Sequence, residues 1–155
     1  MTLTAVTVRA ASMPALSPAP LWLRLAAAVY DLFPLIALWM LTAGLCLLAV
    51  GGHVDLVNPP FVWRILLRTA LVVVTAAYFV VSWSRGGQTL GMRAWRIRTV
   101  HADGSPLTWR SALLRFVLAL LSLAALGGGF LYGLFDVERR CAHDIFAKSI
   151  VVRSG

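Results

Sequence analysis

"RLAAAVYDLF", residues 24–33, lies near the start of an apolar run that extends from about Leu21 to Val50. The run is longer than the roughly 20 apolar residues that a membrane-spanning helix needs, yet it contains Arg24 and Asp31. A charged side chain at the centre of a bilayer costs about 2.5–3.5 kcal/mol on insertion scales. Both charges therefore need a partner within the protein or at the membrane surface.

The composition of the whole chain also favours a membrane protein. Its 155 residues are 60% hydrophobic and 13% charged, with a mean hydropathy of +0.84, whereas soluble domains have about 45–50% apolar and about 25% charged residues. The net charge is +8, and all but one of the 14 basic residues are arginine. Because these arginines flank or interrupt apolar runs, we expect their partners to be the bilayer and its anionic lipid headgroups, and not nucleic acid.

The chain divides into a tail and one membrane domain. Residues 1–19 contain two prolines and lack the pattern of a signal peptide, so they are expected to form a disordered N-terminal tail. Residues 20–153 are then the transmembrane domain. Its second apolar segment runs from about Phe61 to Trp83, and the polar residues of that segment lie on one stripe of a helix. These residues are Arg64, Arg68, Thr75 and Ser82, with Tyr78 nearby.

The rest of the chain predicts a broken helix and a small sheet. A third helical region begins near Pro106 and is expected to break at Gly127–Gly129. "WRIRTV" alternates with period two before the turn "ADGS", which predicts a strand at about 93–100 that pairs with "KSIVVR" at 148–153. The predicted fold class is therefore an all-α membrane protein, with a bundle of about three transmembrane helices and a short cytoplasmic two-stranded β element.

The distribution of basic residues predicts the orientation. The connection at 85–115 is rich in arginine, whereas the connection at 51–60 has no basic residue. The positive-inside rule places 85–110 and the N-terminus in the cytoplasm, as expected for a multi-pass protein of the cell inner (plasma) membrane. The basic C-terminal tail favours the same side, which requires 107–135 to be re-entrant. A straight third crossing is the alternative.

Asp31 is the charge that most needs a partner. Arg24 shares its helix face but leans away from it, and Arg24 can reach lipid phosphate from the end of the helix. If the second helix is antiparallel, Arg68 lies at a similar depth to Asp31, and Arg115 in the third region is a second candidate. Asp31 would form either a structural salt bridge with one of these arginines or a cation or proton site of its own, and the sequence leaves both open.

Three motifs in order resemble the RDD family of membrane proteins, which is named for one arginine and two aspartates. Arg24 and Asp31 in "LRLAAAVYDLF" match the family's arginine and first aspartate, and Asp144 in "FDVERRCAHDIFAKSIVV" matches the second. "GQTLGMRAWRIRTVHADGSPLT" at 87–108 resembles the stretch after the family's second helix, although Met92 stands where many members carry lysine. The resemblance implies a membrane protein and suggests transport, without naming a ligand.

Two functions follow as hypotheses. The first is ion-coupled or small-solute transport by an oligomer, with Asp31 as a buried cation or proton site and Arg24, Arg68, Arg115 and Asp144 as further site residues. The second is a structural or accessory subunit whose buried charges hold helices or partners together, as a homo-oligomer or with another membrane protein. No P-loop, nucleophile elbow or metal-ligand spacing is present in the sequence, so we expect no enzyme activity, no metal and no cofactor.

Overall fold

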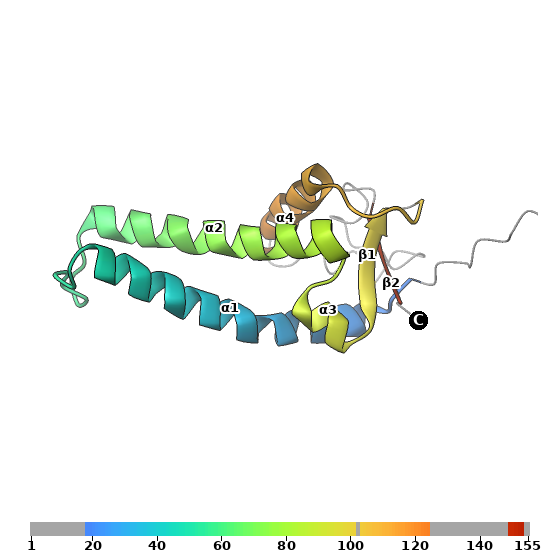
Figure 1. Ribbon diagram of the computed structural model, residues 1–155, viewed down its shortest axis with the longest axis horizontal. Helices are drawn as coiled ribbons and strands as arrows, with labels where there is room; N and C mark the ends of the chain where they lie inside the picture. Colours follow the sequence, from blue (N-terminus) through green and yellow to red (C-terminus); the bar gives the residue numbers. More distant parts are fainter. Residues whose placement is uncertain (1–17, 102, 125–148, 154–155) are drawn as a thin grey trace, which may run out of the picture.

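The computed structural model describes residues 18–101, 103–124 and 149–153. The elements are α1 (Leu21–Ala49), α2 (Phe61–Gly86), α3 (Leu90–Ala94), β1 (Ile97–His101), α4 (Trp109–Ala124) and β2 (Ser149–Arg153). Figure 1 shows α1 and α2 side by side as a hairpin, with α3 and both strands at one end, where α4 packs against α2. We call α3, β1 and β2 the platform. The two long apolar helices and the small sheet that the sequence predicts are present.

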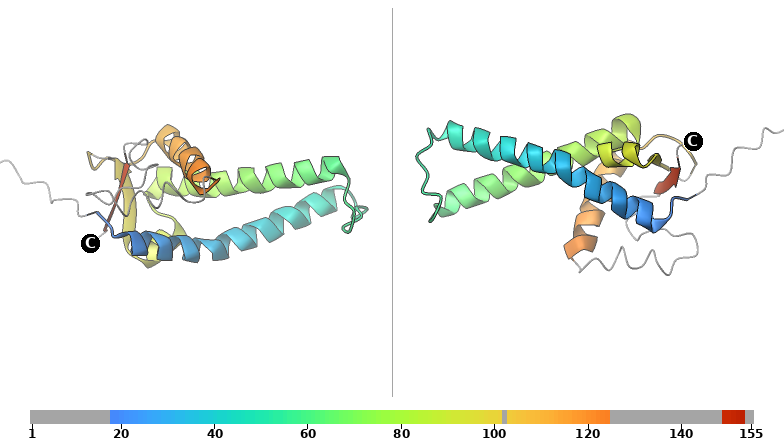
Figure 2. Two further views of the ribbon diagram at one scale, coloured as in Figure 1. Left: turned by 180° about the vertical axis from the view of Figure 1, so that it is seen from behind. Right: turned by 90° about the horizontal axis from the view of Figure 1, so that it is seen from below.

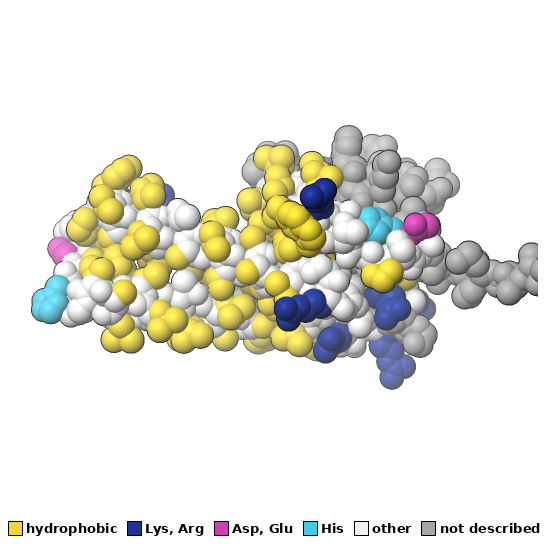
Figure 3. Space-filling model, turned by 45° about the horizontal axis from the view of Figure 1, so that its top comes forward, with side chains coloured by type: hydrophobic (Ala, Val, Ile, Leu, Met, Phe, Trp, Pro, Cys, Tyr) yellow, Lys and Arg dark blue, Asp and Glu magenta, His cyan; other side chains and the backbone are white. Residues whose placement is uncertain are grey.

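The hairpin is made of helices long enough to cross a bilayer. α1 has 29 residues and α2 has 26, and both are apolar enough to span a membrane. Only 6% of the most apolar window of α1 and none of that of α2 is buried, so their outer surfaces face something other than this chain. Figure 2 shows that the two helices cross at an angle, and apolar side chains cover the hairpin in Figure 3.

The platform begins with a short helix that the sequence did not predict. The strand was expected from residue 93, but β1 starts at Ile97, because Arg93 is still part of α3. Thr89 caps this helix by accepting a hydrogen bond from the backbone N–H of Met92, which favours helix over strand at this point. A turn follows in which Arg96 has a positive φ of 50°, and the strand continues to His101.

The two strands pair as the sequence predicts. β1 and β2 are antiparallel, with Thr99 opposite Val151 at the centre of the register. The chain before α1 lies against the same sheet: Pro18 forms an isolated bridge with Val152, and the N–H of Ala19 donates to the carbonyl of Val151 at 2.8 Å. Residues 18–19, assigned to the tail from the sequence, therefore pack on the platform.

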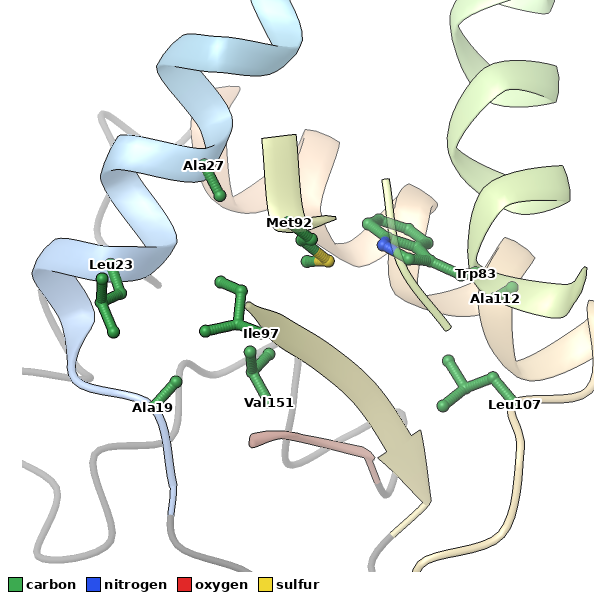
Figure 4. Packing of buried hydrophobic residues seen from close by; sticks show 9 residues of the cluster. All are labelled: Ala19, Leu23, Ala27, Trp83, Met92, Ile97, Leu107, Ala112 and Val151. Carbon is green, nitrogen blue, oxygen red and sulfur yellow. The ribbon is translucent and has the colours of Figure 1, made fainter. Parts of the chain in front are cut away.

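The buried core lies where the hairpin meets the platform. Ile97 of β1 and Val151 of β2 are fully buried and belong to this core. Leu23 and Ala27 of α1 reach them from one side and Trp83 of α2 from the other, as Figure 4 shows. This arrangement fixes the platform to the ends of both long helices.

The third helical region is described only in its first part. α4 begins at Trp109, three residues after Pro106, and ends at Ala124. The expected break at Gly127–Gly129 lies outside the described residues, as does Lys148. Whether 107–135 crosses the membrane or re-enters therefore stays a prediction.

Candidate functional site

Asp31 lies at the junction of three segments and is almost fully buried, with 3% of its surface exposed. It belongs to the inner face of α1, together with the buried residues Ala27 and Leu35 at four-residue spacing. Its Oδ1 accepts hydrogen bonds from the Tyr78 hydroxyl at 2.7 Å and from the Gly91 N–H at 2.8 Å. Its Oδ2 accepts one from the Thr89 hydroxyl at 2.6 Å. These donors replace the water that a carboxylate loses on burial.

Two of the donors are themselves held in place by α3. The Tyr78 oxygen also accepts a hydrogen bond from the backbone N–H of Leu90 at 3.3 Å. The Thr89 oxygen accepts one from the N–H of Met92 at 3.2 Å, so it caps the helix and binds Asp31 at once. The start of α3 is therefore bonded to α1 through Asp31 and to α2 through Tyr78.

Two glycines allow this close approach. A Cβ on Gly91 would overlap the carbonyl oxygen of Ala27 and would lie 3.0 Å from the Asp31 Cγ. Gly87 ends α2 with a φ of 65°, in the left-handed region that favours glycine. A Cβ there would lie 2.7 Å from the Thr99 carbonyl oxygen. Glycine at these two positions thus sets the path of the chain from α2 around Asp31 and into β1.

The structure does not pair Asp31 with either arginine that the sequence offered. Arg68 is exposed on α2, and every donor to Asp31 among the described residues is a hydroxyl or a backbone N–H. Arg115 binds Ser149 of β2 instead of Asp31. The expectation of a counter-ion was wrong because neutral donors from the 89–91 segment and α2 occupy both carboxylate oxygens.

Arg115 instead joins α4 to the platform. Only 3% of it is exposed, and its guanidinium donates to the Ser149 hydroxyl of β2 at 2.7 Å. The same group lies 5.1 Å from the centre of the Trp83 ring of α2, within the range of a cation–π interaction. Arg115 therefore connects three elements, as Asp31 does.

Arg24 is also buried and is held by the chain itself. Its Nε donates to the carbonyl oxygen of Ala19 at 3.1 Å, and the side chain is 8% exposed. Arg24 thus lies on the same face of α1 as Asp31, two turns earlier, without contacting it, as the seven-residue spacing predicts. This bond holds the chain that enters α1, and the expected reach of Arg24 to lipid phosphate stays a prediction.

The stripe predicted on α2 divides into an exposed and an inward part. Arg64 and Arg68 are exposed, whereas the Thr75 hydroxyl accepts a hydrogen bond from the Trp39 indole of α1 at 2.8 Å. Tyr78 binds Asp31. The half of the stripe nearer the platform therefore faces protein, as the polar pattern indicated.

Asp144, the last of the predicted site residues, lies outside the described residues. Across the part of the chain that the structure describes, no group of three His, Cys, Asp or Glu side chains is arranged to hold a metal ion.

The junction explains the sequence motifs that contain Arg24, Asp31 and the 87–92 segment. The RDD family model matches residues 18–148. This chain belongs to the RDD family. Family membership and the two apolar helices together make it an RDD membrane protein, as the three motifs indicated. No curated protein and no solved structure matches the chain.

Thr89 and Gly91 were not predicted from the sequence as partners of Asp31. Both lie in "GQTLGMR", a stretch in which a threonine stands between closely spaced glycines. A threonine at that point is a signal for a helix cap. Nothing in the spacing shows that the same hydroxyl also reaches a carboxylate 58 residues earlier.

Proposed function

We propose that this RDD protein is a non-enzymatic membrane subunit that assembles with itself or with another membrane protein, and that Asp31 holds its fold together. The observation that carries the proposal is the set of three donors on Asp31, from Tyr78, Thr89 and Gly91. These donors fill three of the roughly four acceptor positions of the carboxylate, which leaves little room for a cation. The geometry therefore favours a structural bond over a cation or proton site.

The level of Asp31 along the hairpin supports the same role. Asp31 and Ala49 are 18 positions apart, about 27 Å at 1.5 Å per residue, and Phe61 and Tyr78 are 17 positions apart, about 26 Å. Both lengths are close to the hydrocarbon core of a bilayer, about 30 Å. We place Asp31 and Tyr78 near the membrane boundary, with the platform outside the hydrocarbon core.

The charges at the two ends of the hairpin support a cytoplasmic platform. Six exposed arginines lie at the platform end, whereas the described connection at 51–60 has none. They are Arg85, Arg93, Arg96, Arg98, Arg110 and Arg153. In a chain with both cysteines changed to serine, His53→Cys should react with an impermeant thiol reagent added outside the cell. Asp103→Cys should react only after lysis, and the reverse pattern would invert the proposed orientation.

Assembly would cover the apolar faces that the chain leaves open. Phe33, Met40 and Leu48 of α1 are each more than two-thirds exposed. The mass of the purified protein in detergent, measured by light scattering with the detergent subtracted, should be a multiple of the 16.8 kDa chain or should include a second membrane protein. A monomer with no co-purifying protein, from mild extraction through to the final step, would contradict assembly.

Transport by an oligomer is the second candidate, and the exposure of Arg64 and Arg68 on an apolar helix favours it. In an oligomer these guanidiniums would face a shared, hydrated path. Flux of small ions and solutes into liposomes should then fall in Arg68→Gln while the oligomer keeps its size. Equal flux in liposomes with wild-type protein, with the variant and with no protein would remove this candidate.

A further inference from the structure

A basic pocket lies beside the Asp31 junction, between the end of α2 and α3. It has a volume of about 240 Å³, well above the roughly 10–15 Å³ that a single water needs. Its lining residues are Val81, Ser82, Arg85, Gly86, Gln88, Leu90 and Arg93. The lining has two guanidiniums and no carboxylate, so the pocket suits an anion.

The two arginines are available for a ligand. Both are exposed, and within the described ranges neither forms a salt bridge or a side-chain hydrogen bond. A guanidinium nitrogen of Arg93 lies 3.7 Å from the position that a Cβ on Gly86 would take, so this side chain lies over the end of α2. Arginine matches phosphate well because its planar group donates two parallel hydrogen bonds.

Apolar side chains border the same pocket. Leu90 is 56% exposed and Val81 is 45% exposed, although both lie next to arginines. A soluble anion such as free phosphate would make no use of these two side chains. An amphiphile, with a phosphate next to an acyl chain, would contact both parts of the lining.

The position along α2 agrees with this. Arg85 is seven residues beyond Tyr78, about 10 Å further along the axis. Its side chain leans toward the N-terminus of α2, which points it back toward the proposed membrane boundary. The guanidinium is then in the headgroup layer, which is about 5–8 Å thick on each side of the hydrocarbon core. Figure 3 shows basic side chains at this end of the hairpin beside a continuous apolar surface.

We propose that this pocket binds the phosphate of an anionic phospholipid through Arg85 and Arg93, with Val81 and Leu90 against its acyl chain. The proposal rests on the membrane placement given above, and it goes further by assigning a lipid site to named residues. Ser82 supplies a hydroxyl at the pocket wall. Bound lipid would fix the angle between α2 and α3, close to the donors that hold Asp31.

The test is native mass spectrometry of the full-length protein in detergent, titrated separately with phosphatidylglycerol, phosphatidylcholine and inorganic phosphate. Arg85→Gln/Arg93→Gln should weaken retention of phosphatidylglycerol about tenfold or more, because two charge-assisted contacts are lost. The matched control is Arg98→Gln/Arg153→Gln, which removes the same charge from exposed positions on the sheet. It should retain the lipid within about threefold of wild type, since its arginines do not line the pocket.

Three results would overturn the proposal. Equal loss in both double variants would mean diffuse charge attraction instead of a site. Equal retention of phosphatidylcholine would exclude a site for an anionic lipid. Binding of inorganic phosphate as tight as that of the lipid would make the ligand free phosphate. Failure of the membrane placement is read separately, from the thiol labelling of His53→Cys and Asp103→Cys described above, which should report opposite sides of the membrane.

Discussion

Thr89→Val tests the junction at a single hydroxyl with little change in shape. The variant removes the one hydrogen bond that Asp31 Oδ2 accepts from the described part of the chain, at 2.6 Å, and the cap on the N–H of Met92. A hydrogen bond to a charged group contributes about 1.5–3 kcal/mol, and a helix N-cap contributes about 1 kcal/mol. We therefore expect the free energy of opening α3 away from α1 to fall by about 2.5–4 kcal/mol.

Hydrogen exchange of the peptide covering residues 87–96 measures this opening, because the Gly91 N–H is protected by Asp31. Since each 1.4 kcal/mol is tenfold, protection should fall by about two to three orders of magnitude in Thr89→Val. Thr89→Ser keeps the hydroxyl and should remain close to wild type. Thr108→Val removes a cap from α4 that accepts the N–H of Ser111 and should leave exchange at 87–96 unchanged. Protection in Thr89→Val equal to that in Thr108→Val would refute the reasoning.

Three further variants test other parts of the account. Gly91→Ala should lower the thermal midpoint in detergent micelles, because its Cβ would overlap the Ala27 carbonyl. Gly44 has open space around it, so Gly44→Ala should raise or keep the midpoint, since alanine favours helix. Equal shifts in the two variants would contradict the close approach of Gly91 to Ala27. Tyr78→Phe leaves Asp31 with two donors and should lower the free energy of unfolding, measured by denaturant titration, by about 1.5–3 kcal/mol. A loss near zero would mean that water takes over the hydrogen bond of the Tyr78 hydroxyl. Arg115→Gln should destabilise the contact of α4 with β2 and speed trypsin cleavage at Arg153. The control Arg68→Gln changes an exposed arginine and should alter the free energy of unfolding by no more than about 0.5 kcal/mol. Similar cleavage rates in both variants would show that Arg115 does not hold β2.

Hydropathy and spacing predicted the long elements well. The apolar runs beginning at Leu21 and Phe61 became helices, because mainly apolar sequence of that length has few other stable structures. The first strand followed from the period-two pattern of "WRIRTV", and its pairing followed because "KSIVVR" was the only other good strand candidate. The start of β1 was placed four residues too early, since the capping hydroxyl of Thr89 favours a turn of helix before the alternation begins.

The partners of Asp31 were not predictable in the same way. Charge complementarity pointed to Arg68 or Arg115, but the carboxylate is satisfied by two hydroxyls and a backbone N–H. A backbone donor leaves no mark in the sequence beyond the glycine that makes room for it, here Gly91. The predictable part of the junction was the face of α1, because seven-residue spacing puts Arg24 and Asp31 on the same side.

The most direct test of the central claim is Asp31→Asn, compared with wild type for thermal stability, mass in detergent and ion flux in liposomes. Asp55→Asn is the control, because it removes the same charge from an exposed position. If Asp31 is a structural bond, Asp31→Asn should lower the thermal midpoint and lose assembly, while Asp55→Asn behaves as wild type. An Asp31→Asn protein with wild-type stability and mass but no ion flux would contradict the account and make the carboxylate a transport site.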